Sequence, residues 1–210
     1  DEAERRAALA LCRARLDLAD RLGARCCVNI AGSRGCKWDG PDPANLSEET
    51  FDLIVETVRA IIDEVRPVRT FYTLEPMPWV HPSSPDDYLR LIRAIDRPAF
   101  AVHLDPVNMI NCPWRYYTNG AFLRECFAKL GPYIKSCHAK DIILRETLTV
   151  HLEEVRPGLG GLDYRVFLGE LAKLPPDTPL LLEHLPDEAS YAAAAAHLRR
   201  VAVEMGVALS

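Results

Sequence analysis

The stretch Phe71-Tyr72-Thr73-Leu74-Glu75-Pro76 is a mostly apolar run of strand length that ends on an acid and is stopped by a proline. The same pattern recurs at Ala101-Val102-His103-Leu104-Asp105-Pro106. Proline cannot donate a ladder hydrogen bond, so each strand is expected to end at the acid. A carboxylate therefore stands at the carboxyl end of two successive predicted strands.

Apolar runs alternate with longer amphipathic segments throughout the chain. Hydrophobic residues recur at helical spacing in residues 2–22, and Ser47 and Ser84-Pro85 are typical N-terminal caps of two further helices. This alternation predicts parallel strands in an α/β fold, although a doubly wound sheet fits the pattern as well as a barrel does. The expected strands lie near residues 26–31, 70–75, 100–105, 134–140 and 179–183.

The composition is that of an ordinary globular protein. The chain has 210 residues, of which 49% are hydrophobic and 26% charged. We expect no signal peptide and no membrane span, since every apolar run is shorter than the roughly 20 residues a span needs. The net charge of −5 argues against a nucleic-acid partner. The seven cysteines form no CxxC pair, which favours a reducing, cytoplasmic compartment without a disulfide framework or structural zinc.

Four predicted strands finish on residues that can bind a metal: Glu75, Asp105, His138 and Glu183. The carboxyl ends of parallel strands share one edge, which is where barrel enzymes place their active sites. Three carboxylates and an imidazole suit one divalent ion such as Mn²⁺, Mg²⁺, Co²⁺ or Zn²⁺. Each residue alone is more often a cap, an ion-pair partner or a core histidine, but four strands ending alike favour a joint site.

Strand parity extends this predicted site, because residues two apart share a face. His103 would lie one layer below Asp105, and Lys140 would lie at the mouth of the site. There Lys140 could orient a substrate oxygen or carry a proton, with a rim ion pair to Asp141 as the alternative. By the same rule His184 faces away from the site and is structural.

The residue types suit proton abstraction next to a carbonyl. A divalent metal stabilises the enediolate charge that develops, and a carboxylate on either face can remove and return the proton. Glu75 and Glu183 come from separate predicted strands and could flank a substrate in this way.

Short motifs occur in a characteristic order: Leu74-Glu75-Pro76, His103-Leu104-Asp105-Pro106, Cys137-His138-Ala139-Lys140-Asp141, the glycine-rich stretch from Arg156 to Tyr164, and Leu182-Glu183-His184. In this order they resemble the sugar phosphate isomerase/epimerase superfamily. This is the xylose-isomerase-like TIM barrel group, which includes ketose 3-epimerases, inosose dehydratase and type IV apurinic endonucleases. The resemblance runs from about residue 15 to the C-terminus. It implies a TIM-type (β/α) barrel.

The resemblance also implies roles for the matching residues. In ketose epimerases, the residues that match Glu75, Asp105, His138 and Glu183 bind one divalent metal, and the two glutamates form the acid/base pair. Two positions depart from that pattern, because His81 and Asn108 stand where the epimerases have a glutamate and a histidine that contact substrate. The segment around Trp114 and Arg115 should lie over the site, or else pack on its own helix. The predicted substrate contacts are His81, His103, Asn108, Trp114, Arg115 and Arg156.

In such a barrel the strand of Glu75 would be the fifth. Residues 1–210 would then be a single barrel domain that covers about the last five βα units and lacks its N-terminal ones. An open edge favours a homodimer or another partner. The expected function is a metal-dependent isomerase or epimerase of a ketose, sugar phosphate or related polyol. The alternatives are a dehydratase of an inosose-like substrate, an apurinic-site nuclease, which the acidic charge disfavours, and a non-catalytic sugar-binding barrel.

Overall fold

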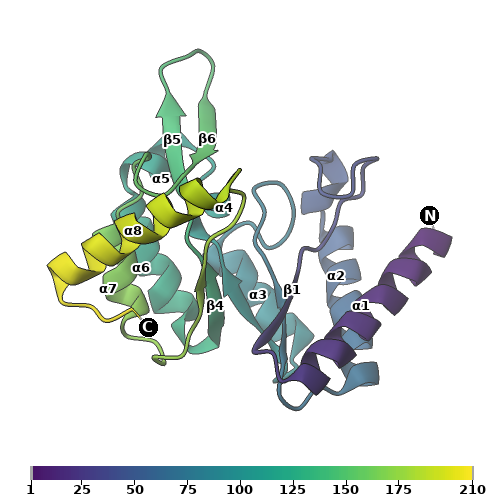
Figure 1. The fold of residues 1–210 in the computed structure, drawn as a ribbon. Coiled ribbons are helices and arrows are strands. Elements are labelled where there is room, and N and C mark those ends of the chain that lie inside the picture. Colours follow the sequence, from purple (N-terminus) through teal and green to yellow (C-terminus); the bar gives the residue numbers. More distant parts are fainter. Residues whose placement is uncertain (1, 210) are drawn as a thin grey trace. The chain divides into compact units, whose positions relative to one another are not determined.

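The computed structural model describes residues 2–209, which form two compact units (Figure 1). The first unit ends at His103 and the second begins at Leu104. Strands and helices alternate in the first unit, as predicted. The first unit contains α1 (Glu2–Leu22), β1 (Cys26–Asn29), the 3₁₀ helix η1 (Pro43–Leu46), α2 (Glu48–Val65), β2 (Phe71–Leu74), α3 (Pro85–Ile95) and most of β3 (Phe100–Leu104). The second contains α4 (Pro106–Met109), α5 (Pro113–Tyr117), α6 (Asn119–Leu130), the 3₁₀ helix η2 (Gly131–Tyr133), β4 (Ile134–His138), β5 (Asp141–Arg145), β6 (His151–Val155), α7 (Tyr164–Leu171), β7 (Leu180–Leu181) and α8 (Glu188–Met205).

Strands β1, β2 and β3 of the first unit lie side by side and run parallel. Cys26 of β1 is opposite Phe71 of β2, and Tyr72 of β2 is opposite Phe100 of β3. The expected strands near residues 26–31, 70–75 and 100–105 are therefore confirmed. Because the strands are parallel, their carboxyl ends lie at one edge of the sheet.

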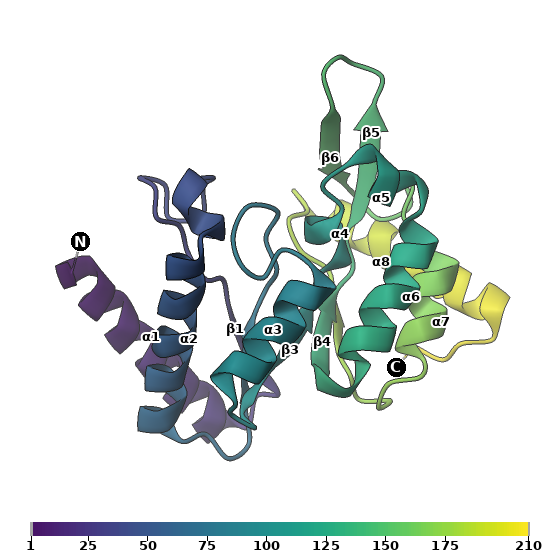
Figure 2. The ribbon, with the colours of Figure 1, turned by 180° about the vertical axis from the view of Figure 1, so that it is seen from behind.

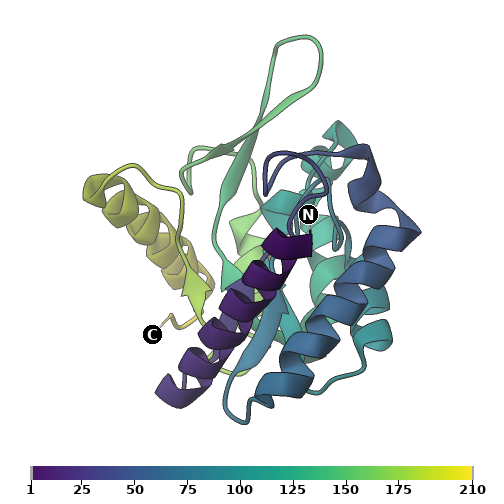
Figure 3. The same cartoon turned by 90° about the vertical axis from the view of Figure 1, so that its right-hand side faces the viewer.

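The helices of the first unit begin where the sequence places their caps. The Ser47 hydroxyl accepts a backbone N–H in the first turn of α2, and the Ser84 hydroxyl does the same for α3. Helices α1 and α2 pack side by side (Figure 3). The buried Tyr88 of α3 ties two strands together, because its hydroxyl lies 2.5 Å from the carbonyl oxygen of Leu74 and 3.1 Å from that of Ala101.

In the second unit, β4 and β7 pair in parallel, with Cys137 opposite Leu180. Helix α7 packs against both α6 and α8, and Figure 2 shows α6 beside α7. The rings of Phe127 and Phe167 lie 5.8 Å apart in this core. Within residues 2–209, no helix combines the length and the apolar character that a membrane crossing requires.

The predicted strand at residues 134–140 ends earlier than expected. Strand β4 stops at His138, and the chain re-enters extended structure at Asp141 as β5, which pairs antiparallel with β6. The resulting hairpin projects beyond the helices of its own unit (Figure 1). This hairpin was not expected, because residues 133–141 look like one continuous strand in the sequence.

The side chain of Asp141 explains this break. Its buried carboxylate accepts four backbone N–H groups: those of Ile142 and Leu162 at 2.9 Å on Oδ1, and those of Gly158 at 2.9 Å and Gly160 at 3.0 Å on Oδ2. A Cβ atom at Gly160 would lie only 2.4 Å from Asp141 Oδ1, so this close approach requires glycine. The glycine-rich loop therefore wraps around the first residue of β5.

We predict that Asp141→Ala lowers the free energy of unfolding by about 2–4 kcal/mol, because four backbone N–H groups lose their acceptor. Asp163→Ala serves as the control, since the Asp163 carboxylate accepts the N–H of Val166 at 3.0 Å as the cap of α7. Losing such a cap costs about 1 kcal/mol. Urea denaturation followed by circular dichroism measures both, and equal losses would contradict the role of Asp141.

Candidate metal centre

Three side chains of the second unit converge where strands end. Asp105, His138 and Glu183 each offer a ligand atom, and these atoms lie within 4.8 Å of one another. His138 Nδ1 is 2.9 Å from Glu183 Oε1 and 3.4 Å from Asp105 Oδ2. His138 is the last residue of β4, and Glu183 follows shortly after β7, which pairs with β4. Two carboxylates and an imidazole at this spacing fit a divalent cation.

Asp105 is oriented by the helix that it starts. It is the N-cap of α4, and its Oδ1 accepts the backbone N–H of Asn108 at 3.1 Å. Its other oxygen, Oδ2, is thereby turned toward His138 and Lys140. Complete burial alone would raise the pKa of Asp105, but hydrogen bonds and charge from His138 and Lys140 outweigh it and hold that pKa well below its usual value.

Lys140 is buried among carboxylates. Its Nζ lies 2.8 Å from Asp105 Oδ2, 2.5 Å from Glu183 Oε1 and 3.6 Å from Glu154 Oε2, and its side chain is 1% exposed. The predicted position at the mouth of the site is therefore wrong, because the ammonium lies inside the cluster. The alternative partner, Asp141, has its carboxylate committed to backbone N–H groups of the glycine-rich loop.

The side chain of Glu183 is partly exposed to solvent, at 22%, whereas that of Asp105 is 0% exposed. Burial would raise the pKa of Glu183, but contacts with His138 and Lys140 prevail and lower it to about 2. Glu183 is thus ionised at neutral pH, which is the charge state that both cation binding and proton acceptance require.

Two further residues that were not predicted to belong to the site, His184 and Glu154, join this cluster. His184 Nδ1 lies 3.2 Å from both carboxylate oxygens of Glu154, and His184 Nε2 lies 3.6 Å from Glu183 Oε2. Strand parity placed His184 away from Glu183, but β7 ends at Leu181 and His184 adopts a positive φ of 56°. Parity does not hold in such a backbone. Glu154 lies on the hairpin, and no sequence motif singled it out.

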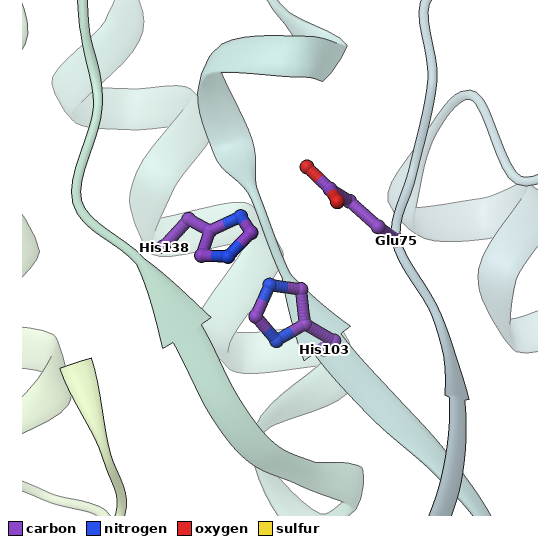
Figure 4. Close-up of side chains that lie close together, drawn as sticks. All are labelled: Glu75, His103 and His138. Carbon is purple, nitrogen blue, oxygen red and sulfur yellow. The ribbon is translucent and has the colours of Figure 1, made fainter. Parts of the chain in front are cut away.

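Three of the predicted site residues, Glu75, His81 and His103, belong to the first unit. Glu75 directly follows β2, and His103 is fully buried in β3. The side chains of Glu75 and His103 can offer ligand atoms within 4.8 Å of each other. Figure 4 shows both, together with His138 at the end of β4. Glu75 stands at the strand end where the sequence predicts it, and its role as a ligand stays a prediction.

Among the predicted substrate contacts of the second unit, the two arginines form hydrogen bonds within the chain, whereas Trp114 is exposed. The Arg115 guanidinium donates to the carbonyl oxygen of Met109 at 2.8 Å and to Asn111 Oδ1 at 3.1 Å, so it holds its own loop. Trp114 is 77% exposed and accessible to a ligand. Arg156 donates to a neighbouring backbone carbonyl at 3.3 Å.

His81, also a predicted substrate contact, is buried in the first unit. Its Nδ1 lies 2.7 Å from Asp87 Oδ2, and its ring meets Phe51 edge-on at 5.5 Å. The hydrogen bond to Asp87 raises the pKa of His81, although burial opposes it. These contacts give His81 a structural partner within the unit.

The whole-chain comparison decides the family. Residues 1–201 match the family model described as Xylose isomerase-like TIM barrel. The chain belongs to this family. The expected TIM-type fold, of which this chain carries a part, is thereby confirmed. No curated protein matches the chain.

Solved structures of this barrel type share the fold at low sequence identity. A xylose isomerase-like TIM barrel protein from Mycobacterium smegmatis in complex with magnesium is 19% identical, with a TM-score of 0.68, and the match covers 94% of this chain and 67% of that one. The probable 3-DHS dehydratase AsbF from Bacillus anthracis is 18% identical, with a TM-score of 0.67 and coverages of 90% and 68%. D-psicose 3-epimerase from Clostridium cellulolyticum H10, solved with D-tagatose, is 14% identical, with a TM-score of 0.70 and coverages of 99% and 73%.

The contact between His81 and Asp87 predicts a pH dependence of stability. Because the folded pKa of His81 is raised, its contribution is complete below the unfolded value of about 6.5 and is lost as pH rises through the folded value. The difference in unfolding free energy between the wild type and His81→Gln should therefore be constant at acidic pH and shrink as the pH rises above about 6.5. Urea titrations at several pH values measure it, and a constant difference would contradict the ion pair.

Proposed function

We propose that this chain carries the metal-binding part of an isomerase or epimerase that acts on a ketose, a sugar phosphate or a related polyol. The convergence of Asp105, His138 and Glu183 is the observation that carries the proposal. Membership of the xylose isomerase-like barrel family and similarity in fold to a D-psicose 3-epimerase support it. Glu75 is proposed as the fourth ligand on its sequence position, since it precedes a proline at a strand end as Asp105 does.

The residues of the second unit would divide the work between them. Asp105, His138 and Glu183 would hold a divalent cation, whose positive charge would favour removal of a proton next to a carbonyl. Asp105 would act only as a ligand, since it is fully buried and fixed as a helix cap. Glu183 is ionised and accessible, so it suits proton transfer, with Glu75 as the proposed second acid/base group. Before a cation binds, Lys140 pairs with Glu183 and keeps it ionised.

A dehydratase is the second candidate, and the similarity to the probable 3-DHS dehydratase AsbF favours it. Both reactions begin with removal of a proton next to a carbonyl, and they differ in whether a hydroxyl group then leaves. Mass spectrometry of the product separates them, because only the dehydratase product has lost water. A barrel that binds sugar without catalysis would show neither outcome.

We predict that the protein, incubated in D₂O with Mn²⁺ and D-tagatose, D-psicose or D-fructose, exchanges the hydrogen next to the ketose carbonyl. Glu183→Gln should slow this exchange about 100-fold or more, because the amide cannot accept the proton. Proton NMR of the sugar measures the exchange.

Glu153→Gln is the matched control for this experiment. Glu153 is an acid on the hairpin whose Oε2 pairs with Arg145 at 2.8 Å, so its loss should leave exchange unchanged. Exchange retained in Glu183→Gln would remove Glu183 from proton transfer. A wild type that binds Mn²⁺ but exchanges none of the three sugars would contradict the proposed reaction on these ketoses.

A further inference from the structure

Lys140 holds the same carboxylate oxygens that a cation would use. Its Nζ lies 2.8 Å from Asp105 Oδ2 and 2.5 Å from Glu183 Oε1. His138 Nδ1 approaches these two oxygens at 3.4 Å and 2.9 Å. The ammonium and an incoming divalent cation would therefore share two oxygens of the ligand set.

It is unfavourable for the Lys140 ammonium and a divalent cation to share these oxygens, because both are positive and water is largely excluded. The side chains of Lys140 and Asp105 are 1% and 0% exposed, so solvent screens their surroundings poorly. A cation bound by Asp105 and Glu183 would repel the ammonium strongly at contact distance. Lys140 therefore needs another anion within reach once the cation is bound.

Glu154 is placed to be that anion. Its Oε2 lies 3.6 Å from Lys140 Nζ, longer than a hydrogen bond but within reach of a small side-chain rotation. His184 Nδ1 lies 3.2 Å from both Glu154 oxygens and so fixes the carboxylate in place. Glu154 is ordered beside the ammonium without yet forming a close contact with it.

The charges of the second unit agree with a movement of Lys140 from Asp105 and Glu183 to Glu154. Asp105, Glu183 and Glu154 supply three negative charges around one ammonium, which leaves a net charge of −2 within this cluster. A divalent cation would offset these charges while Lys140 stays protonated and turns toward Glu154. Without Glu154, the ammonium would have to keep sharing the two carboxylate oxygens that hold the cation.

We propose that Glu154 is a positioning residue that receives the ammonium of Lys140 when a divalent cation binds to Asp105, His138 and Glu183. This inference rests on the proposed function only in requiring that the cation binds. It makes the β5–β6 hairpin part of the metal-loading step, since β6 carries Glu154.

The test measures Mn²⁺ affinity without any sugar, by titration calorimetry or by the electron paramagnetic resonance signal of free Mn²⁺. Glu154→Gln should weaken binding about tenfold, because Lys140 then keeps competing for the ligand oxygens. Glu153→Gln is the matched control: it removes the same charge from the adjacent residue of β6, whose carboxylate pairs with Arg145. We expect it to change the affinity less than about twofold.

A second variant isolates the role of the ammonium. In a Lys140→Met background there is no ammonium to relocate, so adding Glu154→Gln should weaken Mn²⁺ binding no more than Glu153→Gln does. An undiminished effect of Glu154→Gln in this background would overturn the proposal. If Lys140→Met does not fold, a crystal structure with Mn²⁺ decides instead, and Nζ must then lie within hydrogen-bond distance of Glu154 rather than of Asp105.

The outcomes separate this inference from the proposed function. If the wild type binds Mn²⁺ and Glu154→Gln behaves like Glu153→Gln, the proposed movement of Lys140 to Glu154 is wrong, but the proposed function is unaffected. If the wild type binds less than about a tenth of an equivalent under saturating Mn²⁺, both the proposed metal centre and the proposed movement of Lys140 are wrong.

Discussion

The buried ammonium of Lys140 constrains the functional end of the second unit. Taking a charge out of water costs several kcal/mol, and attraction to partners repays this only where they are fixed at close range. The chain meets that demand with Asp105 at 2.8 Å and Glu183 at 2.5 Å from Nζ. Those carboxylates are thus held ionised and close together before any ligand arrives, which preorganises the site.

The backbone on either side of Lys140 is fixed by different means. His138, two residues earlier, ends a strand that pairs in parallel with β7. Asp141, the next residue, is anchored by four backbone N–H groups, three of them from the glycine-rich loop. Tyr164 adds a hydrogen bond of 2.7 Å from its hydroxyl to the carbonyl oxygen of Lys140. A long flexible side chain is therefore placed by a rigid segment, and its ammonium has little freedom to leave the cluster.

Local sequence rules predicted what local forces determine. The caps at Ser47 and Ser84, and the strands ending near Glu75 and Asp105, follow from turn chemistry and proline within a few residues. These features fixed the order of the elements and where the metal-capable residues stand.

The errors arose where distant segments decide the conformation. The strand expected at 134–140 is cut short because Asp141 binds a loop about twenty residues further on. The burial of Lys140 depends on Glu183, and the left-handed backbone at His184 overrides strand parity. No pattern within a single element contains that information. The contact between His81 and Asp87 is local by comparison. Asp87 lies in the first turn of α3, which Ser84 caps, and is close to His81 in the chain.

The contrast between Asp105 and Glu183 shows how two like charges acquire different functions. Both contact His138 and Lys140, and both have a lowered pKa. Asp105 has a short side chain, and one of its oxygens caps α4, so rotating the carboxylate would break that cap. Glu183 has one more rotatable bond and follows a strand of only two residues. Its second oxygen lies 3.6 Å from Nε2 of the largely exposed His184. The fold therefore fixes the Asp105 carboxylate through a helix cap, whereas the Glu183 carboxylate is held by ion pairs and is partly exposed. This is the asymmetry needed when one acid must hold a cation and the other must also move a proton.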